Sequence, residues 1–170
     1  MKSYVGKTYI LSWVDCLDYA YGYDDIFKLK SFNELATNFI RSAHKELEAT
    51  VSLLLEDNPQ SKAIETARMA VEMFLKAILI IEDSWDEDKL RKKISHDLSK
   101  AIEYCINVTG SKELQNLKSL LSVFPAVGER YEGKSRKTAE LWQGYTLAQV
   151  VGAIFTRMFS DRDTRPQLFS

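Results

Sequence analysis

Arg91 and His96 are the residues whose types and spacing are best suited to catalysis. A neutral imidazole can accept the proton of a ribose 2′-hydroxyl as a general base, and a nearby guanidinium can stabilise the charge that develops on the phosphate. We expect His96 at the start of a helix, where the positive end of the helix dipole disfavours imidazolium. The alternative is that His96 caps this helix and packs beneath the preceding loop. The pair predicts either a phosphodiester-cleaving site or a structural contact.

Other catalytic and metal-binding signatures are missing from the sequence. It contains neither the glycine-rich loop of dinucleotide-binding proteins nor the P-loop pattern. Di-iron bundles need a glutamate three residues before a histidine, but Arg41 and Lys93 hold those positions before His44 and His96. His44 and Glu48 are one helical turn apart, and we expect a surface ion pair there. We predict no metal and no cofactor.

Basic side chains gather in two segments that we expect to be loops at helix starts. Residues 83–95 change from acidic to basic along the chain, and residues 128–137 are polar and basic. An antiparallel bundle could bring both segments to one end, where they would form a site for an anionic ligand. The alternative is that both loops are simply solvated. The candidate nucleic-acid or nucleotide-binding residues are Lys92, Lys93, Arg130, Lys134, Arg136 and Lys137.

The composition is that of an ordinary globular protein of one domain. The 170 residues carry a net charge of −1, so no global field attracts nucleic acid or an anionic membrane. Seven glycines and three prolines are few for an all-β protein and favour helices. We expect Cys16 and Cys105 to be reduced, buried thiols in a cytoplasmic protein. The N-terminus lacks signal-peptide features, and the apolar stretches are too interrupted to span a membrane.

Helical periodicity predicts two long helices in the first half of the chain. Ser31 and Glu34 form a capping box that starts the first, which is broken by Asn58-Pro59. Its apolar stripe is Phe32, Leu35, Phe39, Ala43, Leu47, Val51 and Leu54. The second helix starts at Pro59, ends near Glu82 and is apolar nearly all round, so we expect it at the centre of the bundle. Glu72 and Lys76 on it should form an ion pair.

The second half predicts two short helices and a long one. One starts near His96 with Leu98, Ala101, Ile102 and Cys105 facing inward, and the other ends at Pro125. The last helix spans roughly residues 138–159. On it Gly144, Ala148 and Gly152 form a row of small residues at four-residue spacing. Because mid-helix glycine costs about 1 kcal/mol, we expect another helix to approach closely there, within the bundle or across a dimer interface.

The first thirty residues are rich in aromatic side chains. Ile10, Trp13, Val14, Leu17 and Tyr21 follow helical spacing, and Gly22 is expected to close that helix as a C-terminal cap. We expect this segment to pack its aromatics on the bundle; the alternative is a stacking platform for bases or a partner. The predicted organisation is an N-terminal segment 1–30, a bundle 31–160 and a flexible tail 161–170.

Taken together, these patterns predict an all-α, antiparallel up-and-down bundle of four to five main helices. The stretch Ala63–Ile81, a charged loop, His96-Asp97-Leu98, and then Arg130-Tyr131-Glu132 ahead of a long last helix resemble the HEPN domain family over residues 32–160. The resemblance implies a bundle that is commonly a homodimer. Some members are metal-independent ribonucleases with an Arg-x4–6-His motif. Others bind nucleotides or RNA, or are partners of small nucleotidyltransferases in toxin–antitoxin pairs.

The resemblance favours a non-catalytic member. Active members usually place the motif near the start of the last long helix, where this chain has Arg130, Arg136 and Lys137 but no histidine. The leading hypothesis is a HEPN-like module that binds RNA, a nucleotide or a protein partner such as a nucleotidyltransferase or an antitoxin. The alternative is a metal-independent ribonuclease that uses Arg91 and His96. A third is a protein-binding scaffold that uses the small-residue row or the aromatic N-terminus.

Overall fold

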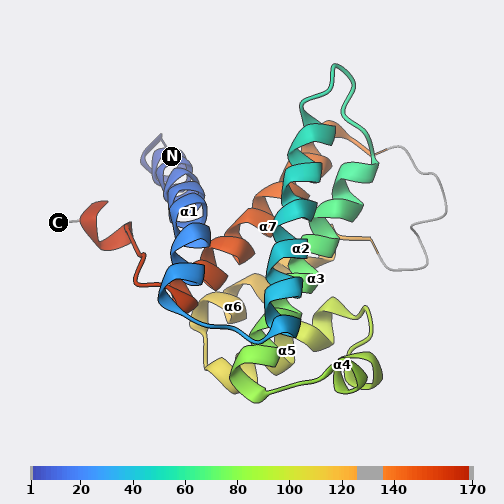
Figure 1. The fold of residues 1–170 in the computed structure, drawn as a ribbon. Coiled ribbons are helices and arrows are strands. Elements are labelled where there is room, and N and C mark those ends of the chain that lie inside the picture. Colours follow the sequence, from blue (N-terminus) through green and yellow to red (C-terminus); the bar gives the residue numbers. More distant parts are fainter. Residues whose placement is uncertain (1, 126–135, 169–170) are drawn as a thin grey trace. The chain divides into compact units, whose positions relative to one another are not determined.

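The protein is an all-α helical bundle, as predicted. The computed structural model describes residues 2–125 and 136–168, and no strand occurs within those ranges. The elements, shown in Figure 1, are α1 (Lys2–Leu29), α2 (Glu34–Leu54), α3 (Lys62–Asp83), α4 (Glu87–Lys93), α5 (Leu98–Thr109), α6 (Lys112–Leu117), the 3-10 helix η1 (Lys118–Val123), α7 (Thr138–Phe159) and the 3-10 helix η3 (Arg165–Leu168). None of the described helices is long and apolar enough to cross a membrane.

The chain divides into two compact units. The first consists of residues 1–32 and 149–170, and the second of residues 33–148. The last helix, α7, passes from the second unit into the first, and its bounds are those that the sequence predicted.

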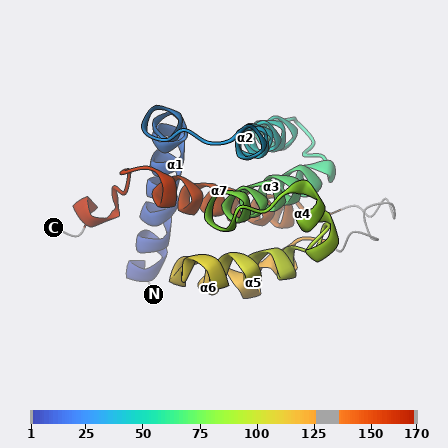
Figure 2. The same ribbon diagram turned by 60° about the horizontal axis from the view of Figure 1, so that its bottom comes forward.

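The second unit is built around α3. Helices α2 and α3 lie side by side and antiparallel (Figures 1 and 2), and α5 packs on a different side of α3 (Figure 2). The prediction that this helix is the central one is confirmed, because its buried residues lie all round the helix. The residues predicted to face inward from α5 are all buried, namely Leu98, Ala101, Ile102 and Cys105.

Two predicted helix starts and part of one predicted apolar stripe are wrong. Helix α2 begins at Glu34, and its cap is Asn33, whose Oδ1 accepts a hydrogen bond of 2.7 Å from the amide of Ala36. The predicted cap, Ser31, lies two residues earlier. Helix α3 begins at Lys62, so Pro59 belongs to the connecting segment rather than to the first turn. The first half of the α2 stripe is also shifted, because Ala36 and Ile40 are buried in place of Leu35 and Phe39.

The charged segment 83–95 contains a helix, α4, where a loop was predicted. Asp86 caps it by accepting a hydrogen bond of 2.7 Å from the amide of Lys89. Acidic residues occupy the first turn and basic residues the last, which is the order that a helix dipole favours. Leu90 and the preceding Trp85 are buried and hold α4 on the unit. The change of charge sign therefore marks the polarity of a short helix.

In the first unit, α1 continues straight through Gly22, which was predicted to be its C-terminal cap. The glycine is buried, and a Cβ atom built on it would lie 2.8 Å from Cβ of Thr156 on α7. That distance is shorter than real Cβ contacts allow, so any larger side chain would force α1 and α7 apart. Gly22 permits a close helix approach and does not end the helix.

The predicted inward stripe of α1 is largely exposed. Trp13 and Tyr21 are 57% and 59% exposed, and Ile10 and Leu17 are exposed as well; only Val14 of that stripe is buried. The buried face carries Asp18, Tyr19, Gly22 and Ile26 instead. This face is buried because Asp18 pairs with Arg157 and because Gly22 lets α1 approach Thr156 closely. Neither contact can be predicted from apolar periodicity.

Candidate functional site

Three charged residues at four-residue spacing on α3 form a buried ionic cluster. Nη1 of Arg68 lies 3.1 Å from Oε2 of Glu72, and Nζ of Lys76 lies 2.7 Å from Oε1 of Glu72. The side chains of Arg68 and Glu72 are only 4% and 9% exposed. The predicted Glu72–Lys76 pair is thus confirmed, but it is part of a larger interior network and not a surface pair.

His96 joins this cluster from the segment between α4 and α5. Its Nδ1 lies 2.9 Å from Oε1 of Glu72, and its main-chain carbonyl accepts a hydrogen bond from Nη2 of Arg68. We call Arg68, Glu72, Lys76 and His96 the Glu72 cluster. Burial raises the pKa of Glu72, but the hydrogen bonds and charges of Lys76 and His96 outweigh burial and hold that pKa below its ordinary value. The carboxylate is therefore ionised at neutral pH.

The residue that caps α5 is Asp97. Its Oδ1 accepts a hydrogen bond of 3.1 Å from the amide of Lys100. The interpretation of His96 as a cap is therefore wrong. Instead, Glu72 fixes one nitrogen of the imidazole, while the side chain as a whole remains 59% exposed. Glu72 thus fixes the orientation of a ring that is largely open to solvent.

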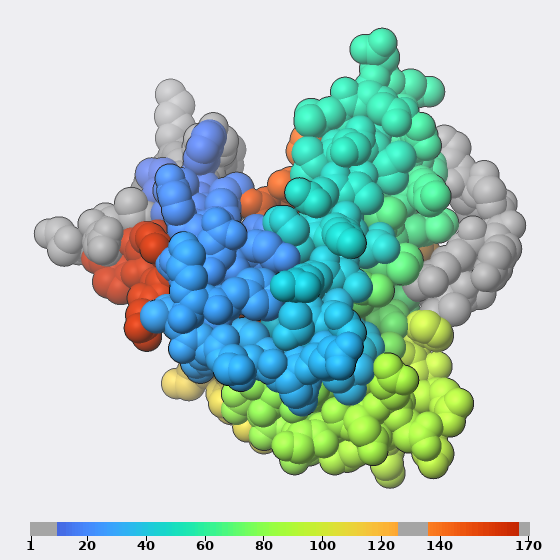
Figure 3. Space-filling view, in the orientation of Figure 1, coloured from blue at the N-terminus to red at the C-terminus, as the bar shows by residue number. Residues whose placement is uncertain are grey.

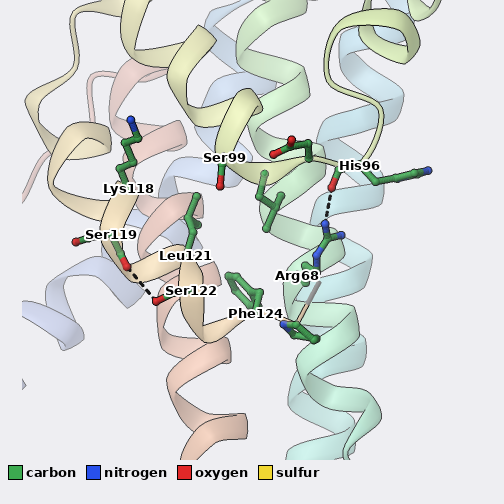
Figure 4. Close-up of a pocket in the computed structure, with 11 residues that line it drawn as sticks. Arg68, His96, Ser99, Lys118, Ser119, Leu121, Ser122 and Phe124 are labelled. Carbon is green, nitrogen blue, oxygen red and sulfur yellow. Dashed lines mark hydrogen bonds between the residues drawn. The ribbon is translucent and has the colours of Figure 1, made fainter. Parts of the chain in front are cut away.

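A cavity of about 540 Å³ opens beside the start of α5. We call it the Ser119 cavity. Figure 4 shows Arg68 and Lys118 on opposite sides of it, with Ser99 and Ser122 between them, Ser119 beside Lys118, and Phe124 at its base. Ser122 donates a hydrogen bond of 3.1 Å to the carbonyl of Ser119, and Lys118 forms a 2.7 Å ion pair with Glu103. Asp97 also lines the cavity, and its carboxylate is engaged by the amide and Nζ of Lys100. The remaining cations and hydroxyl groups suit an anionic, oxygen-rich ligand.

A second cavity, of about 310 Å³, lies between α2, α3 and α4. We call it the Phe39 cavity. The two candidate catalytic residues, Arg91 and His96, both border it. Nη2 of Arg91 lies 2.7 Å from Oδ1 of Asp88, one turn earlier on α4. The sequence motif thus brings its arginine and histidine to one cavity, with the guanidinium engaged by a carboxylate.

Of the candidate nucleic-acid-binding residues, the four that the structure describes, Lys92, Lys93, Arg136 and Lys137, do not border either cavity. Lys92 and Lys93 lie exposed on α4, which is coloured yellow-green in Figure 3, and Nζ of Lys92 lies 3.7 Å from Oδ2 of Asp88. Arg136 and Lys137 precede α7, and the amide of Arg136 donates a hydrogen bond of 3.1 Å to Oγ of Ser61. His96, which directly follows the first basic segment, is bonded to Arg68, about 10 Å beyond Ser61 along α3. The two basic segments are therefore tied to α3 at different levels. Arg130 and Lys134 lie outside the described residues.

The other predicted sites are placed as follows. Nε2 of His44 lies 3.5 Å from Oε1 of Glu48, as expected for a pair on the surface of α2. A Cβ atom on Gly144 would lie 3.0 Å from Cγ1 of Ile64, so α3 approaches α7 closely there. Ala148 and Gly152 are buried. Cys105 is buried and burial raises its pKa, whereas Cys16 is only partly buried.

Sequence reasoning missed Arg68, Lys118 and the serines of the Ser119 cavity. Arg68 carried a readable signal, because an arginine four residues before a glutamate on an otherwise apolar, central helix must find a buried partner. Lys118, Ser119 and Ser122 carried none, since they share a cavity with His96 only through the packing of η1 beside α5. Among the residues that the structure describes, no group of three or more His, Cys, Asp or Glu side chains could hold a metal ion.

Comparisons with known proteins do not assign this chain to a family. No protein-family model matches it, and no solved structure matches it. The 3-epi-6-deoxocathasterone 23-monooxygenase CYP90D1 of Arabidopsis thaliana is 24% identical over 130 residues, which are 76% of this chain. The chain spans only 26% of the length of that protein. A match this distant and partial does not bear on the HEPN resemblance, which stays a prediction.

Proposed function

We propose that this chain is a HEPN-like, non-catalytic module that binds the phosphate of a nucleotide or of single-stranded RNA in the Ser119 cavity. The observation that carries the proposal is the placement of Arg68 and Lys118 on opposite sides of a cavity bordered by three serines. Arg68 is held in place by Glu72 and by the carbonyl of His96, so one cation of the site is preorganised. Lys118 is half-exposed and can turn from Glu103 to a bound phosphate.

Substitution of Lys118 tests the proposal. We expect Lys118→Ala to weaken binding of GMP and of a fluorescein-labelled U10 RNA about tenfold or more, because a hydrogen bond to a charged group contributes about 1.5–3 kcal/mol. Calorimetry measures the first ligand and fluorescence anisotropy the second. Lys112→Ala is the matched control, since Lys112 is an exposed lysine of the neighbouring helix α6 that does not border the cavity.

The two basic segments are the alternative location for the ligand. If Lys92→Glu combined with Lys137→Glu abolished binding while Lys118→Ala had no effect, the ligand would lie on the basic segments and the cavity proposal would be wrong. The HEPN resemblance further implies a homodimer and, in some relatives, a nucleotidyltransferase or antitoxin partner. Both belong to the same proposal and rest on the resemblance alone.

A second candidate function is metal-independent RNA cleavage, and one observation favours it. A carboxylate that holds one nitrogen of an imidazole leaves the other nitrogen as a proton acceptor, which is the arrangement that general-base catalysis uses. Glu72 holds Nδ1 of His96 in this way, and Arg91 borders the same cavity. Against it, the chain has no histidine near the start of the last long helix, where active HEPN members usually place the motif.

Cleavage of end-labelled RNA in EDTA separates the two candidate functions. A ribonuclease of this kind would release 2′,3′-cyclic phosphate ends, and His96→Ala would reduce the rate at least about a hundredfold, the lower range of general acid–base contributions. We expect wild-type protein and His96→Ala from matched preparations to leave the RNA equally intact. Cleavage by the wild type that disappears in the variant would establish the enzyme and overturn the non-catalytic proposal.

A further inference from the structure

The Phe39 cavity has no role in the phosphate site proposed above, but it adjoins the Ser119 cavity that forms that site. His96 borders both cavities. Figure 4 shows its carbonyl directed to Arg68 and its imidazole extending away from Ser99 and Leu121, out of the Ser119 cavity. A ligand whose phosphate occupies the Ser119 cavity can therefore continue past His96 into the Phe39 cavity. Such a ligand must be longer than a phosphate group and must carry a part that suits the second lining.

The lining of the Phe39 cavity suits a flat, partly apolar group with hydrogen-bond donors. Phe39 contributes an aromatic ring from α2, and Leu90 a buried apolar side chain from α4. Glu87 and Asp88 add two carboxylates from the first turn of α4, and Lys76 adds an ammonium group that is paired with Glu72. Asp88 is neutralised by Arg91, but no residue that the structure describes forms an ion pair with Glu87. The ring of Phe39 thus lines the same cavity as a carboxylate acceptor.

Among the nucleobases, this combination selects guanine. A carboxylate has two acceptor oxygens and no donor. Guanine is the base whose Watson–Crick edge presents two adjacent donors, N1–H and the 2-amino group. Adenine and cytosine pair a donor with an acceptor there, and uracil places one donor between two carbonyls. For these three bases a carboxylate meets an acceptor, and that repulsion adds to the discrimination. Unpaired bases that stack on aromatic side chains are the usual target of sequence-specific RNA recognition.

We propose that the Phe39 cavity is a guanine subsite, in which the base stacks on Phe39 and donates both Watson–Crick hydrogens to Glu87. This inference rests on the proposed function, because the adjoining phosphate occupies the Ser119 cavity. The preferred ligand is then single-stranded RNA with a guanosine next to the bound phosphate, and His96 lies where the chain passes from one cavity to the other.

The test compares three labelled RNA decamers by fluorescence anisotropy: U10, the same strand with one central guanosine, and the same strand with inosine in its place. A bidentate contact discriminates by about tenfold or more. We expect the guanosine strand to bind at least about tenfold more tightly than U10. The inosine strand should lose most of that gain, because inosine lacks the 2-amino group. Equal affinity for all three strands would overturn the guanine subsite.

Variants locate the preference within the protein. Glu87→Gln and Phe39→Leu should abolish the preference for guanosine, whereas Glu82→Gln, at an exposed glutamate outside both cavities, should change neither that preference nor the affinity for U10. Phe39→Leu keeps an apolar side chain at this partly buried position and removes the aromatic ring. If Lys118→Ala weakens U10 binding and the guanosine preference is missing, the proposed function stands and this inference fails. If no strand binds, this inference fails, and if GMP does not bind either, the proposed function fails with it.

Discussion

Glu72→Gln is expected to lower the free energy of unfolding by about 3–5 kcal/mol, the cost of removing one partner from a buried ion pair. The substitution keeps the shape of the side chain but leaves the guanidinium of Arg68, only 4% exposed, without its carboxylate. Lys76 and the Nδ1 atom of His96 lose the same partner. Urea unfolding followed by circular dichroism measures the change, with Glu82→Gln as the control at an exposed position of the same helix.

The pH dependence of stability gives this prediction a second, independent measurement. The folded-state pKa of Glu72 lies below its ordinary value of 4.5. Its ionised form therefore stabilises the fold above pH 4.5, and that contribution is lost as the pH falls through the lower folded-state value. The wild type should lose more stability between neutral and acid pH than Glu72→Gln does. A variant as stable as the Glu82→Gln control would show that the Glu72 cluster contributes nothing to the fold.

The same cluster connects stability to the proposed site. The carbonyl and the imidazole of His96 are both held by residues of α3, so the start of α5 and the border between the two cavities are fixed from α3. A ligand that crosses His96 binds a surface whose geometry is already set, which reduces the entropy that binding must overcome. Replacing the cluster should therefore reduce RNA affinity even where the protein remains folded.

Apolar periodicity was sufficient where an element packs through its apolar residues. The bounds of α7, the central position of α3 and the inward face of α5 all follow from three- and four-residue spacing. The Glu72–Lys76 pair followed in the same way, because its partners are neighbours on one helix. These are local patterns, and a single sequence contains all the information that they require.

The remainder depends on contacts between residues that are distant in the sequence. The face that α1 buries is set by Asp18 and Gly22, whose partners Arg157 and Thr156 lie on α7. Likewise, Lys118 and Ser119 border a cavity with Arg68 because η1 packs beside α5. Apolar periodicity treats every aspartate or glycine as an exposed residue. It therefore predicted the wrong buried face for α1. It also gave no reason to group residues of α3, α5 and η1 in one site.

Asp18→Asn is expected to have an effect of similar size on the first unit, about 3–5 kcal/mol. Asp18 is fully buried. Its Oδ1 accepts hydrogen bonds of 3.0 and 2.7 Å from the amide and hydroxyl of Thr164, and its Oδ2 lies 3.1 Å from Nη1 of Arg157. Every partner is a donor, so the amide nitrogen of asparagine must face one of them and lose that bond. Hydrogen exchange of the Thr164 amide reports this contact directly.

Asp15 cannot take over the role of Asp18. Its Oδ1 lies 2.8 Å from Nη1 of Arg157, but burial, opposed by the hydrogen bond and charge of Arg157, leaves its pKa above the ordinary value. Ionisation of Asp15 therefore lowers the free energy of unfolding as the pH rises from the ordinary pKa through the higher folded-state pKa. Asp18, in contrast, anchors both Arg157 and the segment after α7.

We expect Asp18→Asn to speed hydrogen exchange across residues 160–165, which the sequence predicted to begin a flexible tail. Asp24→Asn, on the exposed face of α1, should leave it unchanged, because solvated carboxylates contribute little. Unchanged protection of the Thr164 amide in Asp18→Asn would show that Asp18 does not hold this segment.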